Sequence, residues 1–174
     1  MALWIASAIW MATIFIFSAD SAAESEGKSG AVFSLISGFL HDGGILPPIE
    51  PLDATAIIRK TAHLAEYFIL GLLATAAWAA SLGEPGGRAQ IGLAGRYGAA
   101  LGIAYAATDE LHQFFVPGRA AMLTDVMLDG IGAVAGAAAM ALLCEAAIRR
   151  AESPPRQNRA QLGQQKGGTP RKWL

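Results

Sequence analysis

Three short stretches of the chain place ionisable side chains, at helical spacing, in segments that are otherwise apolar. They are Arg59-Lys60-x-x-His63-x-x-Glu66-Tyr67, Asp109-Glu110-x-His112-Gln113 and Asp125-x-x-x-Asp129. An imidazole one helical turn from a carboxylate can bind a metal ion or serve as a general base, and intramembrane carboxylates can relay protons. A charged side chain near the centre of a bilayer costs about 2.5–3.5 kcal/mol. If these segments cross a membrane, their ionisable groups must therefore be paired, hydrated or functional.

The composition indicates a membrane protein. Hydrophobic residues make up 53% of the chain and charged residues only 16%, which is less charge than a soluble domain of this size carries. A helix needs about 20 mostly apolar residues to cross a bilayer. Four segments meet this requirement, approximately over residues 2–19, 62–82, 97–116 and 122–148. A further apolar helical pattern over residues 32–40 is too short to cross and predicts a helix at the membrane interface.

The sequence therefore predicts an all-α fold, a polytopic transmembrane helical bundle with four spans and a short interfacial helix, within one domain over residues 1–148. Pro47, Pro48 and Pro51 are expected to hold the chain extended before the second span. Residues 149–174 are basic and poor in apolar side chains, which predicts a disordered cytoplasmic tail.

The distribution of basic residues predicts the orientation of the spans. Most of the Lys and Arg residues lie between the second and third spans or after the fourth. Because basic loops stay in the cytoplasm, both termini are expected there, in a protein of the inner (plasma) membrane. The start of the second span, the end of the third and the start of the fourth then share the outer side, so the three polar stretches can meet.

We expect these stretches to form a polar pocket that opens outward, about 10 Å below the membrane boundary. Its expected members are His63, Glu66, Asp109, Glu110, His112, Gln113, Arg119, Asp125 and Asp129. Lys60 is expected to extend to the interface instead. Glycines at four-residue spacing, Gly98 with Gly102 and Gly132 with Gly136, predict close helix packing beneath the pocket.

The three blocks closely resemble the VanZ-like family of bacterial membrane proteins in residue type, order and spacing. The blocks are Arg59-Lys60-Thr61-Ala62-His63-Leu64-Ala65-Glu66-Tyr67, Asp109-Glu110-Leu111-His112-Gln113 with Pro117-Gly118-Arg119, and Asp125-Val126-Met127-Leu128-Asp129-Gly130-Ile131-Gly132. The likeness extends more loosely to the Phe17-Ser18 ending of the first span. It implies a small polytopic membrane protein, in a family whose named member is associated with low-level teicoplanin resistance. It brings no established catalytic mechanism.

Our leading interpretation is a pocket that binds a cell-envelope component, either a peptidoglycan precursor, a glycopeptide or a lipid head group. Membrane lipids are expected partners, nucleic acid is not, and the oligomeric state stays open. On this interpretation the chain is not an enzyme and holds no metal or other cofactor.

Three alternatives remain open from the sequence. The polar residues can form a structural cluster without a ligand, in which His63 pairs with Glu66 and Arg119 with a carboxylate. They can form a membrane-embedded enzyme or metal site, from His63 with Glu66 and Asp109 with His112. They can also serve proton-coupled transport. No HExxH motif, glycine-rich phosphate loop or nucleophile elbow occurs in the sequence to favour catalysis.

Overall fold

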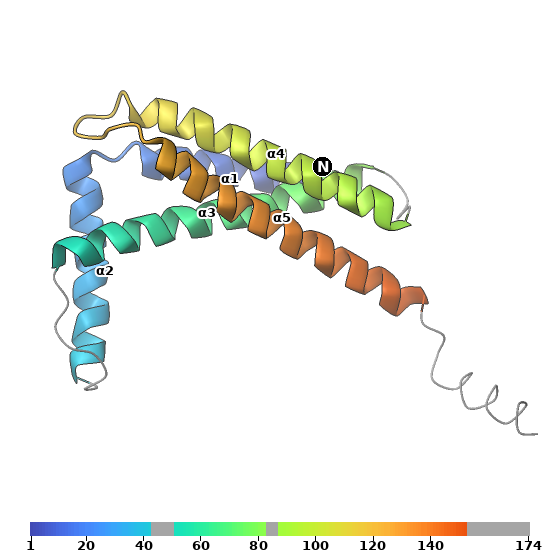
Figure 1. Ribbon diagram of the computed structural model, residues 1–174, viewed down its shortest axis with the longest axis horizontal. Coiled ribbons are helices and arrows are strands. Elements are labelled where there is room, and N and C mark those ends of the chain that lie inside the picture. Colours follow the sequence, from blue (N-terminus) through green and yellow to red (C-terminus); the bar gives the residue numbers. More distant parts are fainter. Residues whose placement is uncertain (43–50, 83–86, 153–174) are drawn as a thin grey trace, which may run out of the picture.

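The computed structural model describes residues 1–42, 51–82 and 87–152 of the 174-residue chain. Within these ranges it contains five helices and no strand, which confirms the predicted all-α fold. The helices are α1 (Ala2–Ser18), α2 (Ala22–Asp42), α3 (Pro51–Ser81), α4 (Gly87–Gln113) and α5 (Leu123–Glu152). Helices α1, α3, α4 and α5 form an elongated bundle, and α2 leaves it at one end at a steep angle (Figure 1).

The bundle helices alternate in direction along the chain, so that α3 and α5 run one way and α1 and α4 the other (Figure 1). Trp4, near the start of α1, donates its indole N–H to Oγ of Ser81 at the end of α3, at 2.8 Å. Ser18, at the end of α1, donates its hydroxyl to Asp109 near the end of α4. The ends of α1 and α4 and the starts of α3 and α5 therefore lie together.

Two of the helices are long and apolar enough to cross a membrane on their own. They are α3 from Ala54 to Ser81, and α5. Helices α1 and α2 together pass the same test as a pair bent by 103°, which gives two or three candidate spans among the described residues, not the predicted four. Helix α1 has only 17 residues, and α4 carries two arginines and the Asp109-Glu110 pair, which lower its hydropathy.

Helix α2 is longer than the predicted interfacial segment, since it begins at Ala22. A capping box starts it. The Glu24 carboxylate accepts hydrogen bonds from the backbone N–H and the hydroxyl of Ser21 at 2.9 and 2.8 Å, and the Glu24 N–H donates to Ser21 Oγ at 3.3 Å. These bonds satisfy N–H groups that the first turn of a helix leaves free. The Ser-x-x-Glu spacing is readable in the sequence and explains the earlier start.

Removing this cap should loosen the first turn of α2. For Ser21→Ala, we expect about fivefold faster amide hydrogen exchange at residues 22–26, because losing a cap costs about 1 kcal/mol. The hydrogen bonds from Ser21 lower the pKa of Glu24 below its ordinary value of 4.5. The protection should therefore be full above pH 4.5 and be lost as the pH falls through the lowered pKa. Ser37→Ala, in the same helix, is the control, and equal exchange in both variants would contradict the prediction.

Three other helix ends differ from the predicted boundaries. Pro51 is the first residue of α3, where its missing N–H costs nothing, so the expectation of an extended chain at this proline is wrong. Pro47 and Pro48 lie outside the described residues. Helix α4 begins at Gly87, well before the predicted start of the third span. Helix α5 continues to Glu152, so the first residues of the predicted tail are helical, and the remainder lies outside the described residues.

Glycines bring α5 into direct contact with the backbone of α3. A Cβ atom at Gly132 would lie 2.5 Å from the carbonyl oxygen of Leu64, and one at Gly136 would overlap the carbonyl group of Phe68. The predicted glycine pair on α4 lies equally close to residues of α3 and α5. Small residues at four-residue spacing allow this approach, and both predicted packing faces are confirmed.

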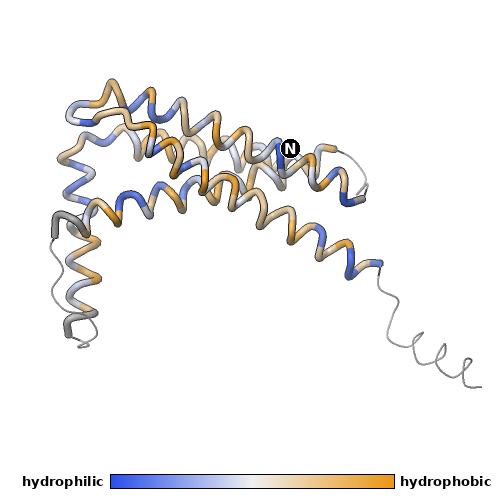
Figure 2. Tube along the Cα trace, viewed as in Figure 1, coloured by the Kyte–Doolittle hydropathy of each residue, from blue (hydrophilic) through white to orange (hydrophobic). Residues whose placement is uncertain are grey.

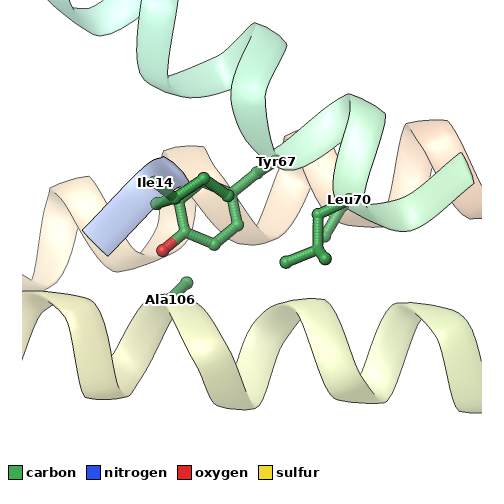
Figure 3. Close-up of a cluster of buried hydrophobic side chains, with 5 residues drawn as sticks. Ile14, Tyr67, Leu70 and Ala106 are labelled. Atoms are coloured by element: carbon green, nitrogen blue, oxygen red, sulfur yellow. The ribbon is translucent and has the colours of Figure 1, made fainter. Parts of the chain in front are cut away.

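The buried core is small and centres on Tyr67. Its ring lies among Ile14 of α1, Leu70 of α3 and Ala106 of α4 (Figure 3). Large apolar side chains lie mostly on the outside instead, and Leu142 of α5, for example, is 67% exposed. An exposed apolar surface of this kind suits a bundle surrounded by lipid.

Candidate functional site

Hydrophilic residues gather at the end of the bundle where α1 and α4 end and α3 and α5 begin, while much of the remaining bundle is hydrophobic (Figure 2). Several of these polar side chains are buried. Asp109 and Asp129 are each 2% exposed, and Glu110 and Gln113 are each 5% exposed. The three polar stretches of the sequence thus meet in space, because successive helices reverse direction.

A chain of hydrogen bonds through Asp109 joins α1 to the turn that follows α4. Oδ2 of Asp109 accepts from the Ser18 hydroxyl at 2.8 Å and from the Gln113 side-chain amide at 3.0 Å. Oε1 of Gln113 accepts from Nη1 of Arg119 at 3.0 Å. Nε of Arg119 donates to the backbone carbonyl of Asp20, also at 3.0 Å. The network fixes the guanidinium of Arg119 over the polar end of the bundle.

Arg119 reaches this position through the turn at Gly118, whose φ of +78° favours glycine. Within the described residues, Arg119 forms no ion pair with a carboxylate. Burial lowers the pKa of Arg119, and the nearby positive charge of Arg59 lowers it further. Two guanidinium groups therefore lie close together in a partly buried region, where their repulsion is only partly screened by water.

Two contacts join α3 to α5 at the same end of the bundle. Nζ of Lys60 lies 2.7 Å from Oδ1 of Asp125, and Nδ1 of His63 lies 3.6 Å from Oδ2 of Asp129. Lys60, which is expected to extend to the interface, pairs with Asp125 while 44% of its side chain stays exposed, because α3 begins at Pro51 and carries Lys60 level with the start of α5. His63 faces α5 in the same way and pairs with Asp129.

The remaining residues of the predicted set occupy different surroundings. Oε1 of Glu110 accepts a hydrogen bond from the backbone N–H of Met122, just before α5, where the helix dipole favours a carboxylate. Glu66 lines a pocket on the side of α3 that faces α2. His112 stacks on Phe15, with the ring centroids 4.2 Å apart, and lines neither of the two pockets described below.

Two adjoining pockets open at this end. The smaller has a cavity of about 20 Å³ and is lined by Arg59, Lys60, His63, Glu110, Gln113, Arg119, Asp125, Leu128 and Asp129. The larger has a cavity of about 220 Å³ and is lined by Phe17, Asp20, Ser25, Lys28, Ser29, Val32, Ile58, Arg59, Ala62, His63, Glu66 and Arg119. Arg59, His63 and Arg119 line both, and so form the boundary between them.

Three residues of this polar end are absent from the set predicted from the sequence. Arg59 faces both pockets, Ser18 bonds to Asp109, and the fully buried Tyr67 hydroxyl has no hydrogen-bond partner. Ser18 lies at the end of a helix without charged residues, where a hydroxyl group has few partners other than those on a neighbouring helix. The sequence therefore contained a signal that Ser18 bonds to another helix. Arg59 offered none beyond its place next to Lys60.

The fold and this polar end define a small helical membrane protein with buried ionisable groups gathered at one end of its bundle. A family model described as VanZ/LLP1 matches residues 3–144, from α1 through most of α5. The chain therefore belongs to the VanZ/LLP1 family, as the resemblance of its three polar blocks implies. No curated protein and no solved structure gives a significant match.

Proposed function

We propose that this member of the VanZ/LLP1 family spans the inner (plasma) membrane four times and binds the anionic head group of a cell-envelope lipid at the outer leaflet. The observation that carries the proposal is the pair Arg59 and Arg119, two neighbouring guanidinium groups that line one pocket together with apolar side chains. Such a pair is stabilised by an anion placed between its members.

The four-span topology is supported by the hydrogen bonds of α1. Trp10 donates its indole N–H to the carbonyl of Glu66 in α3 at 2.8 Å, and the Tyr105 hydroxyl of α4 donates to the carbonyl of Met11 at 2.6 Å. Because α1 is bonded along its length to two other helices, it crosses the same layer as they do. Helix α2, bent by 103° from α1, then lies along the membrane surface, as amphipathic helices do.

The orientation is supported by the charges at the opposite end of the bundle. Arg88 and Arg96 lie in the first turns of α4, and Arg149 and Arg150 in the last turn of α5. By the positive-inside rule, this end faces the cytoplasm, and the polar pockets face outward. Both the N-terminus and the end of α5 lie toward the basic end, so both termini are cytoplasmic (Figure 1).

The larger pocket has the two kinds of wall that an anionic lipid requires. Its basic residues are Arg59, Arg119 and Lys28, of which Lys28 pairs with Asp20, and its apolar ones include Phe17, Val32 and Ile58. Asp20 and Glu66 are its acidic residues. Guanidinium groups bind phosphate oxygens with pairs of parallel hydrogen bonds, and apolar side chains accept the adjoining hydrocarbon. A cavity of about 220 Å³ has room for a phosphate head group, while the hydrocarbon chain of the lipid would lie outside it along the apolar side chains. A glycopeptide antibiotic is much larger, so we favour the lipid.

The guanidinium group of Arg119 is already oriented before such a ligand binds. Its bonds to Asp20 and Gln113 use Nε and Nη1, which fixes the plane of the guanidinium and leaves its other N–H groups for an anion. An arginine whose orientation is already fixed loses less conformational entropy when it binds.

Binding of anionic lipid to the purified full chain tests the proposal. The protein is placed in phosphatidylcholine nanodiscs and titrated with phosphatidylglycerol or with undecaprenyl phosphate, while its melting temperature and native mass spectrum are recorded. We expect saturable binding of one of these lipids, weakened at least tenfold in the Arg59→Gln/Arg119→Gln variant. Each charge-assisted hydrogen bond contributes about 1.5–3 kcal/mol, which makes tenfold the lower bound.

The matched control is Arg88→Gln/Arg96→Gln, which removes the same charge at the opposite end of the bundle. It should bind the lipid as the unmodified protein does. Equal losses in both double variants would mean that binding follows net charge alone, and no saturable binding of either lipid would exclude the proposed function. Tighter binding of undecaprenyl phosphate than of phosphatidylglycerol would identify a carrier of cell-wall precursors as the ligand class.

A further inference from the structure

Three side chains from three helices bring possible metal ligands together beneath the smaller pocket. They are His63 of α3, Asp109 of α4 and Asp129 of α5, and each offers one ligand atom within 4.8 Å of the other two. Helix α1 closes the site from the remaining side through the bond from Ser18 to Asp109. From the sequence pattern, His63 was expected to act with Glu66 and Asp109 with His112. In the folded protein, the three neighbouring residues come from three different helices.

Oxygen atoms at this site are buried without a hydrogen-bond partner. They are Oδ1 of Asp109, Oδ1 of Asp129 and the hydroxyl oxygen of Tyr67, in residues that are at most 2% exposed. Leaving a buried polar atom unpaired costs about 1–3 kcal/mol, and more where the atom is charged. Native proteins leave few such atoms. The Tyr67 hydroxyl faces Asp109 and can satisfy one of its oxygens, so the unpaired oxygen of Asp129 is the stronger indication of a bound group.

The charges at the site also favour a cation. Lys60 pairs with Asp125, and the hydrogen bonds of Arg119 go to Gln113 and to the Asp20 carbonyl. Among the described residues, the basic side chain within ion-pair distance of the two buried carboxylates is His63, whose Nδ1 lies 3.6 Å from Asp129. One imidazole cannot neutralise two carboxylates, whereas a divalent cation does.

The spacing suits a shared metal ion. Two ligands at about 2.0–2.2 Å from one tetrahedral metal lie roughly 3.4 Å apart. The His63–Asp129 separation of 3.6 Å is already close to that value. The remaining separations, of up to 4.8 Å, call for a small rotation of the carboxylate of Asp109.

We propose that His63, Asp109 and Asp129 bind one divalent transition-metal ion, with the Tyr67 hydroxyl next to it. One imidazole and two carboxylates favour Zn²⁺, Mn²⁺ or Fe²⁺, because Ca²⁺ and Mg²⁺ are bound by oxygen alone. His63 and Asp129 also line the smaller pocket, so a further ligand reaches the metal from the outer side. The inference stands apart from the proposed lipid binding, which uses Arg59 and Arg119.

Metal analysis of the purified full chain tests this site. The protein is treated with a chelator, reloaded with Zn²⁺, Mn²⁺ or Co²⁺, freed of excess metal and analysed by mass spectrometry of the elements. We expect about one equivalent of bound metal in the unmodified protein, and at least a tenfold lower affinity in His63→Ala and in Asp129→Asn. The controls His112→Ala and Asp125→Asn change the same residue types nearby and should keep the metal.

A second measurement uses the unmodified protein, so it tests the site even if a variant fails to fold. X-ray absorption of the Co²⁺-loaded unmodified protein should report nitrogen and oxygen ligands and no sulfur, which also excludes Cys144. Loading should raise the melting temperature, since the ion binds only the folded chain. Less than a tenth of an equivalent of metal, a sulfur ligand, or equal loss in His112→Ala would overturn the proposal. None of these results bears on lipid binding at Arg59 and Arg119.

Discussion

Gly136→Ala should destabilise the bundle by about 1–3 kcal/mol, and Gly136→Leu by more, because a side chain here has no space. A Cβ atom at this position overlaps the carbonyl group of Phe68. That group belongs to the backbone of α3 and cannot rotate away as a side chain would. Helices α3 and α5 must therefore separate, which also pulls Lys60 away from Asp125 and disrupts the polar end of the bundle. The loss should appear as a lower melting temperature in detergent.

A matched change at Gly92 separates this effect from the general properties of glycine. A Cβ atom at Gly92 of α4 meets nothing within 4 Å. Because glycine in a helix is about 0.5–1 kcal/mol less favourable than alanine, Gly92→Ala should leave the melting temperature unchanged or raise it. Equal losses at Gly92 and Gly136 would show that close packing is not the cause.

Asp109→Ala should lower stability at least as much as Gly136→Ala. It removes the acceptor for two buried donors, the Ser18 hydroxyl and the Gln113 amide. Each donor left unpaired costs about 1–3 kcal/mol. Gln113 then no longer holds Arg119, so lipid binding should weaken together with stability. Asp109→Asn should retain part of the stability, since its amide oxygen still accepts both bonds.

A double-mutant cycle isolates the contact between Ser18 and Asp109. If this hydrogen bond contributes as the structure indicates, Ser18→Ala and Asp109→Ala together should cost less than the sum of the two single changes. Thr108→Ala is the control, because its exposed hydroxyl bonds only to the carbonyl of Tyr105 in the same helix. Additive losses for Ser18 and Asp109 would argue against the contact.

The sequence was enough to predict that the polar stretches meet, because this depends only on where the apolar segments lie and on the alternating direction of successive helices. The helix starts could not be predicted by the same means. Helix α2 begins at Ala22, between the capping residues Ser21 and Glu24, and α3 begins at Pro51, so neither start lies in a long apolar run. A capping box and a proline in the first turn determine these ends, so hydropathy alone placed them too late.

The partners of individual side chains also required the structure. The sequence allowed His63 to pair with Glu66 on its own helix, whereas it faces Asp129 of α5. The register between α3 and α5 decides this pairing, and that register follows from where Gly132 and Gly136 meet carbonyl groups of α3. Spacing along one helix carries no information about the height of the neighbouring helix, so the partner of Lys60 also required the structure.

The glycine contact between α3 and α5 further limits what can pass through one copy of the protein. Below His63 and Asp129, backbone touches backbone at Gly136, and the neighbouring residues Leu70 and Ala133 are fully buried. A permeation pathway needs a continuous file of water or polar groups. Among the described residues, this apolar layer lies across the path of any such file. We therefore expect the polar end to exchange water and ions with one aqueous compartment only.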